Sequence, residues 1–67
     1  MNLENELQHF KDELKQEEET LKKFETLDTS KMTEEQLEAH TFGITECKES
    51  IIEIKEIIDE IIEEMEA

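Results

Sequence analysis

Hydrophobic side chains recur at alternating steps of three and four residues along two stretches of the chain. The first set is Leu3, Leu7, Phe10, Leu14, Leu21 and Phe24, with Glu17 at its one polar position. The second set is Leu37, His40, Ile44, Cys47, Ile51, Ile54, Ile58, Ile61 and Met65. This spacing is a heptad repeat, which places all members of a set on one face of a helix, as in a coiled coil. We therefore predict two long helices, over about residues 2–27 and about residues 34–66.

Between these stretches, residues 28–33 carry the signals of a turn. Asp28, Thr29 and Ser30 favour turns, and Thr33 followed by Gln36 forms a capping box that starts a helix. Two long helices joined by a short link fold back on each other. The sequence thus predicts an all-α fold with a single domain over residues 1–67, an antiparallel, coiled-coil-like hairpin of two helices.

The short turn also predicts which residues face one another. A symmetric hairpin centred on residues 28–33 brings Phe10 opposite Ile51 and Glu17 opposite Ile44, with Glu17 within reach of His40. A bend is expected at Gly43, which lies in a run of poor helix formers. The heptad phase is kept across Gly43, and this favours a continuous second helix over two separate ones.

Apolar residues outside the heptad positions indicate that one hairpin does not complete the core. A chain of 67 residues buries only about 60% of its unfolded surface. Cys47 is the one cysteine, so no internal disulfide compensates. We expect a homodimer that forms a four-helix bundle. Its expected interface residues are Ile52, Ile57, Ile58, Ile61, Ile62 and Met65.

The chain is strongly acidic, with 21 Asp and Glu, seven Lys, no Arg and a net charge of −14. This composition argues against direct binding of nucleic acid, and no apolar run is long enough to suggest a membrane partner. Glu63 and Glu64 are expected in the last helical turn, where the helix dipole disfavours negative charge, so we interpret them as reserved for a basic partner protein. The predicted acidic face comprises Glu49, Glu53, Glu56, Asp59, Glu60, Glu63 and Glu64.

Phe42 is the one aromatic residue outside the heptad positions. On a continuous helix its ring points to solvent, where it would anchor a partner, because exposed aromatic side chains are typical hot spots. Alternatively, the helix breaks and the ring folds inward, or a second chain covers it.

Catalytic, metal and cofactor sites are not indicated. Glu6 and His9 form a single Glu-x-x-His element, whereas di-iron bundles need two such elements and further glutamates. His40 and Cys47 are seven residues apart on one helix face, about 10.5 Å, which is too far to share one metal or one hydrogen bond. His40 with Glu17 is interpreted as a polar layer that sets the register, with a pH switch as the alternative.

Three functions fit these features, and none requires an enzyme or a cofactor. The first is a cytoplasmic protein-interaction module, an adaptor or inhibitor that acts as a homo-oligomer on a partner protein with a basic surface. The second is an inhibitor that mimics nucleic acid and occupies the basic groove of a DNA- or RNA-binding protein. The third is a structural part of a larger assembly.

Overall fold

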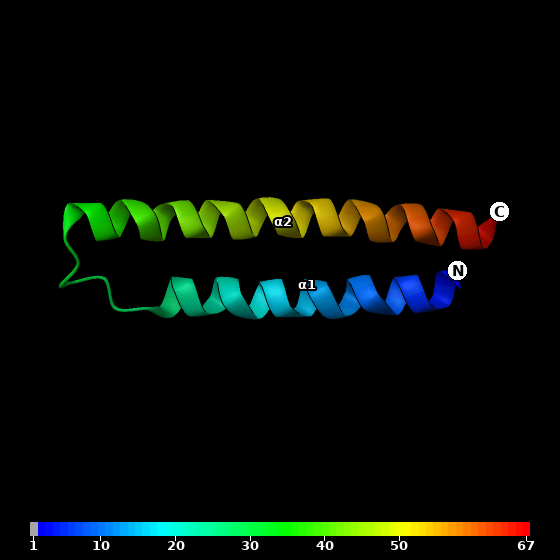
Figure 1. The fold of residues 1–67 in the computed structure, drawn as a ribbon, viewed down its shortest axis with the longest axis horizontal. Coiled ribbons are helices and arrows are strands. Elements are labelled where there is room, and N and C mark those ends of the chain that lie inside the picture. The colour runs from blue at the N-terminus through cyan, green and yellow to red at the C-terminus, as the bar shows by residue number, and fades with distance from the viewer. Residues whose placement is uncertain (1) are drawn as a thin grey trace.

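A computed structural model describes residues 2–67 and shows two helices, α1 (Leu3–Thr26) and α2 (Glu34–Glu66). They run antiparallel, with both chain ends at the same end of a rod (Figure 1). The rod measures 51 × 16 × 14 Å. The predicted all-α helical hairpin is confirmed.

Side chains next to the helix ends satisfy the backbone groups that have no partner within the helix. The carboxamide oxygen of Asn2 accepts a hydrogen bond from the Glu4 amide, 2.8 Å long, and caps α1. At the start of α2, Thr33 and Gln36 bond each other's backbone amides at 3.2 and 3.0 Å. The predicted capping box is confirmed.

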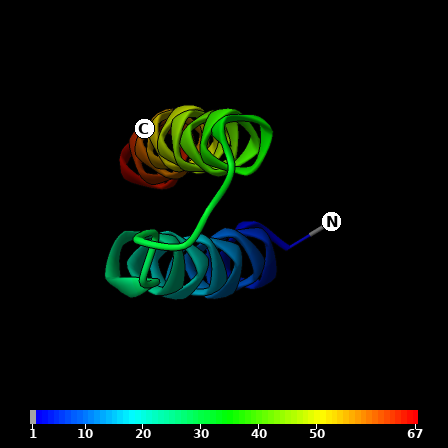
Figure 2. The same ribbon diagram turned by 90° about the vertical axis from the view of Figure 1, so that its left-hand side faces the viewer.

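The hydrophobic core is one row of side chains along α2. Its members are 7–9% exposed and all come from the second heptad set: Cys47, Ile51, Ile54, Ile58 and Ile61. The facing heptad residues of α1 are only half-buried, because a single helix covers them and nothing covers the sides of the pair. Figure 2 shows this arrangement along the rod, with one helix above the other. Removing the row from water supplies most of the stability of such a fold.

Gly43 on α2 lies directly against the ring of Phe24 on α1. A Cβ atom added to Gly43 would lie 3.1 Å from Cζ and 3.3 Å from Cε1 of Phe24. The missing side chain therefore makes room for the Phe24 ring on the surface of α2. α2 continues through this position from Glu34 to Glu66, so the run of poor helix formers does not interrupt it.

The register differs from the predicted one by about one helical turn. Phe24 lies against His40 and Gly43, and Phe10 shares a groove with Ile54 and Ile57 rather than facing Ile51. The link between the helices permits this shift because it does not form a symmetric turn. From the end of α1 it continues in the same direction beneath the first turns of α2, which extend past the end of α1 (Figure 1).

Within the link, local hydrogen bonds hold this asymmetric path. The Ser30 amide donates to the Asp28 carboxylate at 3.0 Å, and the Met32 amide donates to the Thr29 carbonyl at 3.1 Å. The bonds from Ser30 lower the pKa of Asp28. Met32 is half-buried, so the link is not wholly exposed to solvent.

The contact between Phe24 and Gly43 predicts a non-additive effect of two mutations. Replacing an exposed helical Gly by Ala adds about 1 kcal/mol of stability. In Gly43→Ala we expect the gain to be smaller by about 0.5 kcal/mol or more, because the new methyl group displaces the Phe24 ring. In a Phe24→Leu background, the full gain should appear. Chemical denaturation of the four variants measures both effects.

Thr45→Ala, on the exposed side of the same helix, is the matched control and should change stability equally in both backgrounds. An equal gain from Gly43→Ala in both backgrounds would show that the ring does not rest on Gly43.

Candidate functional site

The polar residues at the heptad positions do not form the expected pair. His40 packs edge-to-face against the ring of Phe24, with centroids 5.6 Å apart. Glu17 instead lies near Cys47 and Ser50. The predicted contact between Glu17 and His40 is wrong because the shift in register moves His40 one turn further along α1.

Cys47 is a buried free thiol at the start of the core row. Burial raises its pKa, and the negative charges of Glu17 and Glu46 raise it further. A thiolate is the reactive form of cysteine, so both effects keep this sulfur in its unreactive state. The geometry is that of a packing residue.

The predicted acidic face lies along the outer side of α2, and all seven of its residues are exposed. Glu49, Glu56 and Glu63 follow one another at steps of seven residues and so form one line along the helix. Glu53 and Glu60 form a neighbouring line. The last turn of α2 contains no basic residue, so its helix dipole opposes the charge of Glu63 and Glu64.

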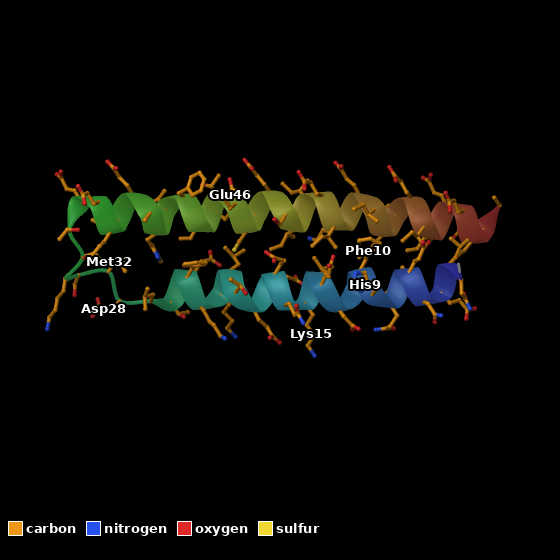
Figure 3. The ribbon with its side chains drawn as sticks, in the orientation of Figure 1. His9, Phe10, Lys15, Asp28, Met32 and Glu46 are labelled. Carbon is orange, nitrogen blue, oxygen red and sulfur yellow. The ribbon has the colours of Figure 1, made fainter. Side chains whose placement is uncertain are left out.

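A groove of about 300 Å³ opens on one edge of the hairpin, between α1 and α2. Its apolar residues are Phe10, Ile54 and Ile57, and Figure 3 shows Phe10 between the helices. Its polar residues are Glu13, Gln16, Glu17, Ser50 and Glu53. We call these eight residues the acidic groove.

A second, shallower hollow continues the same edge towards the link. Thr20, Lys23, Phe24 and Leu27 line it, and Leu27 is 52% exposed. Thr20 and Leu27 follow Glu13 at steps of seven residues, which returns the chain to the same side of α1. The edge that holds the acidic groove is therefore hollow along much of the rod.

Five of the seven lysines lie on the other side of the hairpin, whereas Lys23 borders the second hollow and Lys31 lies in the link. Successive helical residues are rotated by about 100°, so residues two apart in sequence point in nearly opposite directions. Lys11 and Lys15 are each two residues from Glu13, and Figure 3 shows Lys15 on the outer side of α1. The same geometry holds for Lys48 relative to Ser50 and Lys55 relative to Ile57. With Lys22, these residues form what we call the lysine side: Lys11, Lys15, Lys22, Lys48 and Lys55.

Very few charged side chains form ion pairs within one chain. Over residues 2–67, the single ion pair joins His9 Nε2 to Glu13 at 3.4 Å, and it is a charged pair only when His9 is protonated. His9 is exposed, and its ring lies edge-on to Phe10 at 5.2 Å. No lysine of the described chain is within ion-pair distance of an acid, so these charges remain available to another molecule.

Phe42 projects from α2 and is 66% exposed. α2 does not break beside it, so the alternative in which the ring folds inward is wrong. The ring borders a shallow hollow with Leu37, Glu38, Thr41 and Thr45. It thus remains an apolar side chain that the hairpin itself does not use.

The isoleucines predicted for a chain-to-chain interface occupy three different environments. Ile58 and Ile61 are already buried between α1 and α2. Ile57 lines the acidic groove, whereas Ile52 is 57% exposed and lies on the lysine side with the half-buried Ile62. Met65 is 41% exposed at the end of α2.

The sequence interpretation missed Glu13, Gln16, Ser50 and the edge on which they lie. A signal was present in the heptads. Gly43, Ser50 and Ile57 follow one another at steps of seven residues, directly beside a core line of α2. Small residues in that line leave space between the helices, which the Phe24 ring fills at Gly43 and which the acidic groove occupies at Ser50.

No group of three or more His, Cys, Asp or Glu in residues 2–67 could hold a metal ion. Neither helix of the described chain has an apolar stretch of the length needed to cross a membrane. Comparison with protein families, with curated proteins and with solved structures finds no match.

The raised pKa of Cys47 predicts a loss of stability in alkali. The folded chain holds the thiol protonated above its ordinary value of 9.0, whereas the unfolded chain ionises there. The contribution of the protonated thiol to the free energy of unfolding is therefore fully present below pH 9.0. It should be lost as the pH rises through the higher pKa that the thiol has in the folded state. Cys47→Val, which packs but does not ionise, should lack this loss. Urea denaturation from pH 7 to pH 10.5 measures it, and parallel curves for the two proteins would contradict it.

Proposed function

We propose that this protein is an interaction module that pairs with a second copy of itself and binds another protein with a basic surface. Its working parts are two sides of one hairpin, the lysine side for self-association and the acidic face for the partner. No step of this function requires a catalytic residue or a cofactor.

The uncovered surface of the hairpin is the observation that carries the proposal. The chain exposes 5474 Å². A compact monomer of 8.0 kDa is expected to expose about 4,500 Å². The excess, roughly 1,000 Å², is similar to the area that one protein contributes to a standard protein–protein interface, about 800 Å².

Self-association is best supported on the lysine side. Two copies of a chain with a net charge of −14 repel each other wherever only acids meet. The lysine side carries both signs of charge, for example Lys15 beside Glu18 and Lys55 beside Asp59, together with the exposed Ile52. Contact there allows lysines of one copy to pair with acids of the other and produces the predicted four-helix bundle.

Binding of a partner is best supported on the acidic face and at Phe42. Glu63 and Glu64 sit where the helix dipole disfavours them, so they lower the stability of the free chain. Residues that oppose folding are often kept for function. Phe42, with no role inside the hairpin, would supply an apolar anchor next to Glu38 and Glu46.

Mimicry of nucleic acid is a second candidate, because acids recur in lines along a rod 51 Å long. The dependence of the affinity for the partner on ionic strength distinguishes a nucleic-acid mimic from an interaction module. The affinity of a mimic should fall steeply as salt rises, since carboxylates alone carry the interaction, whereas an apolar anchor keeps much of its affinity.

Self-association predicts a concentration-dependent mass. We expect wild-type protein to sediment as a dimer, and Ile52→Glu to raise the dissociation constant at least about tenfold by burying a charge in the contact. Gln16→Glu adds the same charge on the opposite side and should leave the dimer intact. Sedimentation equilibrium measures both, and a wild-type chain that remains monomeric at high micromolar concentration would contradict the self-association.

Binding at the acidic face predicts opposite effects on folding and on function. Glu63→Lys with Glu64→Lys should raise stability by a few tenths of a kcal/mol per site, because the new charges suit the helix dipole. The same double variant should lose the partner recovered by affinity purification from the host of the protein. Asp12→Lys with Glu19→Lys, on α1, is the control that should retain it. Unchanged binding by the Glu63 and Glu64 variant would discard the acidic face as the binding surface.

A further inference from the structure

We propose that the acidic groove is the docking site for one basic amphipathic helix of another protein. The inference rests on the proposed function and deepens it, because it assigns a second contact, separate from the end of α2, and states the form of the partner.

The shape of the hairpin leaves room for a third helix. Two packed helices present a furrow along each edge, and the small side chain of Ser50 leaves the furrow on this edge open. Seen along the rod, the edges of the pair are not covered by any other element (Figure 2). A helix laid in this furrow would complete a three-helix bundle, with apolar residues at steps of three and four reaching Phe10 and Ile57.

The charge of the groove selects a basic occupant. Glu13, Glu17 and Glu53 stand around the apolar side chains, and the lysine side points away from them. Long Lys and Arg side chains match this pattern, because their aliphatic stems pack on apolar surface while their charged ends bond carboxylates. A second copy of this chain has no exposed basic helix face free of acids, so it fits the groove poorly.

The test uses a defined peptide with the full-length protein. The probe is a fluorescent helical peptide with leucine at steps of three and four and lysine or arginine elsewhere. Its control has the same composition with the leucines scattered, which abolishes the apolar face. We expect saturable binding of the probe, followed by fluorescence anisotropy, and at least tenfold weaker binding of the scattered peptide.

Two variants locate the site by charge. Glu13→Lys with Glu53→Lys should weaken binding of the probe at least tenfold. Asp12→Lys with Glu19→Lys makes the same change in net charge at exposed positions of α1 outside the groove and outside the acidic face. It should change the affinity less than threefold. Circular dichroism confirms that both variants remain folded.

One variant locates the site without changing charge. Ser50→Leu fills the groove with an apolar side chain, so it should weaken the probe at least tenfold while the protein stays helical. Thr45→Leu, on an exposed side of the same helix, should leave binding unchanged.

Several outcomes would contradict docking of a helix in the acidic groove without contradicting the proposed interaction module. Equal loss in the two charge variants would show that net charge alone attracts the peptide. Equal affinity of the scattered peptide, or full affinity of Ser50→Leu, would show that no helix lies in the groove. A change in the mass of Ser50→Leu would make the groove an interface between copies instead. Conversely, a partner that survives the Glu63 and Glu64 reversal but is lost in Ser50→Leu would support the groove and remove the acidic face.

Discussion

The contact between the ring of Phe24 and the bare backbone of Gly43 determines how the two helices lie along each other. A ring can approach a helix this closely only where no Cβ intervenes. Once Phe24 is seated there, His40 lies beside it, and Phe10 is carried to Ile54 and Ile57. The overhang of α2, the path of the link and the opening of the acidic groove all follow from this alignment.

A hairpin of two helices also limits how many side chains can be buried. The core is a single row of five side chains, each still 7–9% exposed. Every other residue lies on or near the surface, so the distribution of charge around the pair matters more than in a thicker protein. Because the net charge is −14, the electrostatic potential differs greatly between the side that carries most of the lysines and the sides that carry mainly acids.

These two features together suggest that different sides of the rod bind different molecules. The side with Ile52 and mixed charge suits contact with a like molecule. The acidic groove and the acidic face suit molecules of opposite charge, and Glu53 belongs to both. A partner that engages both would span α1 and α2 and would meet the hairpin only when it is folded, because the groove exists only where the two helices are packed.

The sequence by itself determined the two helices and the helix face that supplies the core row, through the heptad pattern, and the capping box at Thr33, through a residue three positions away. The outward position of Phe42 was one of the alternatives that the pattern left open, and the unbroken course of α2 decided it. The register was not determined in this way. Equivalent turns of a repeating pattern satisfy the same burial, and the choice among them depended on an asymmetric link and on the fit of one ring to one glycine. The acidic groove was likewise decided by tertiary structure, since Glu13 and Glu53 belong to different helices. Their proximity, and the side to which the lysines point, depend on how one helix is rotated and shifted against the other.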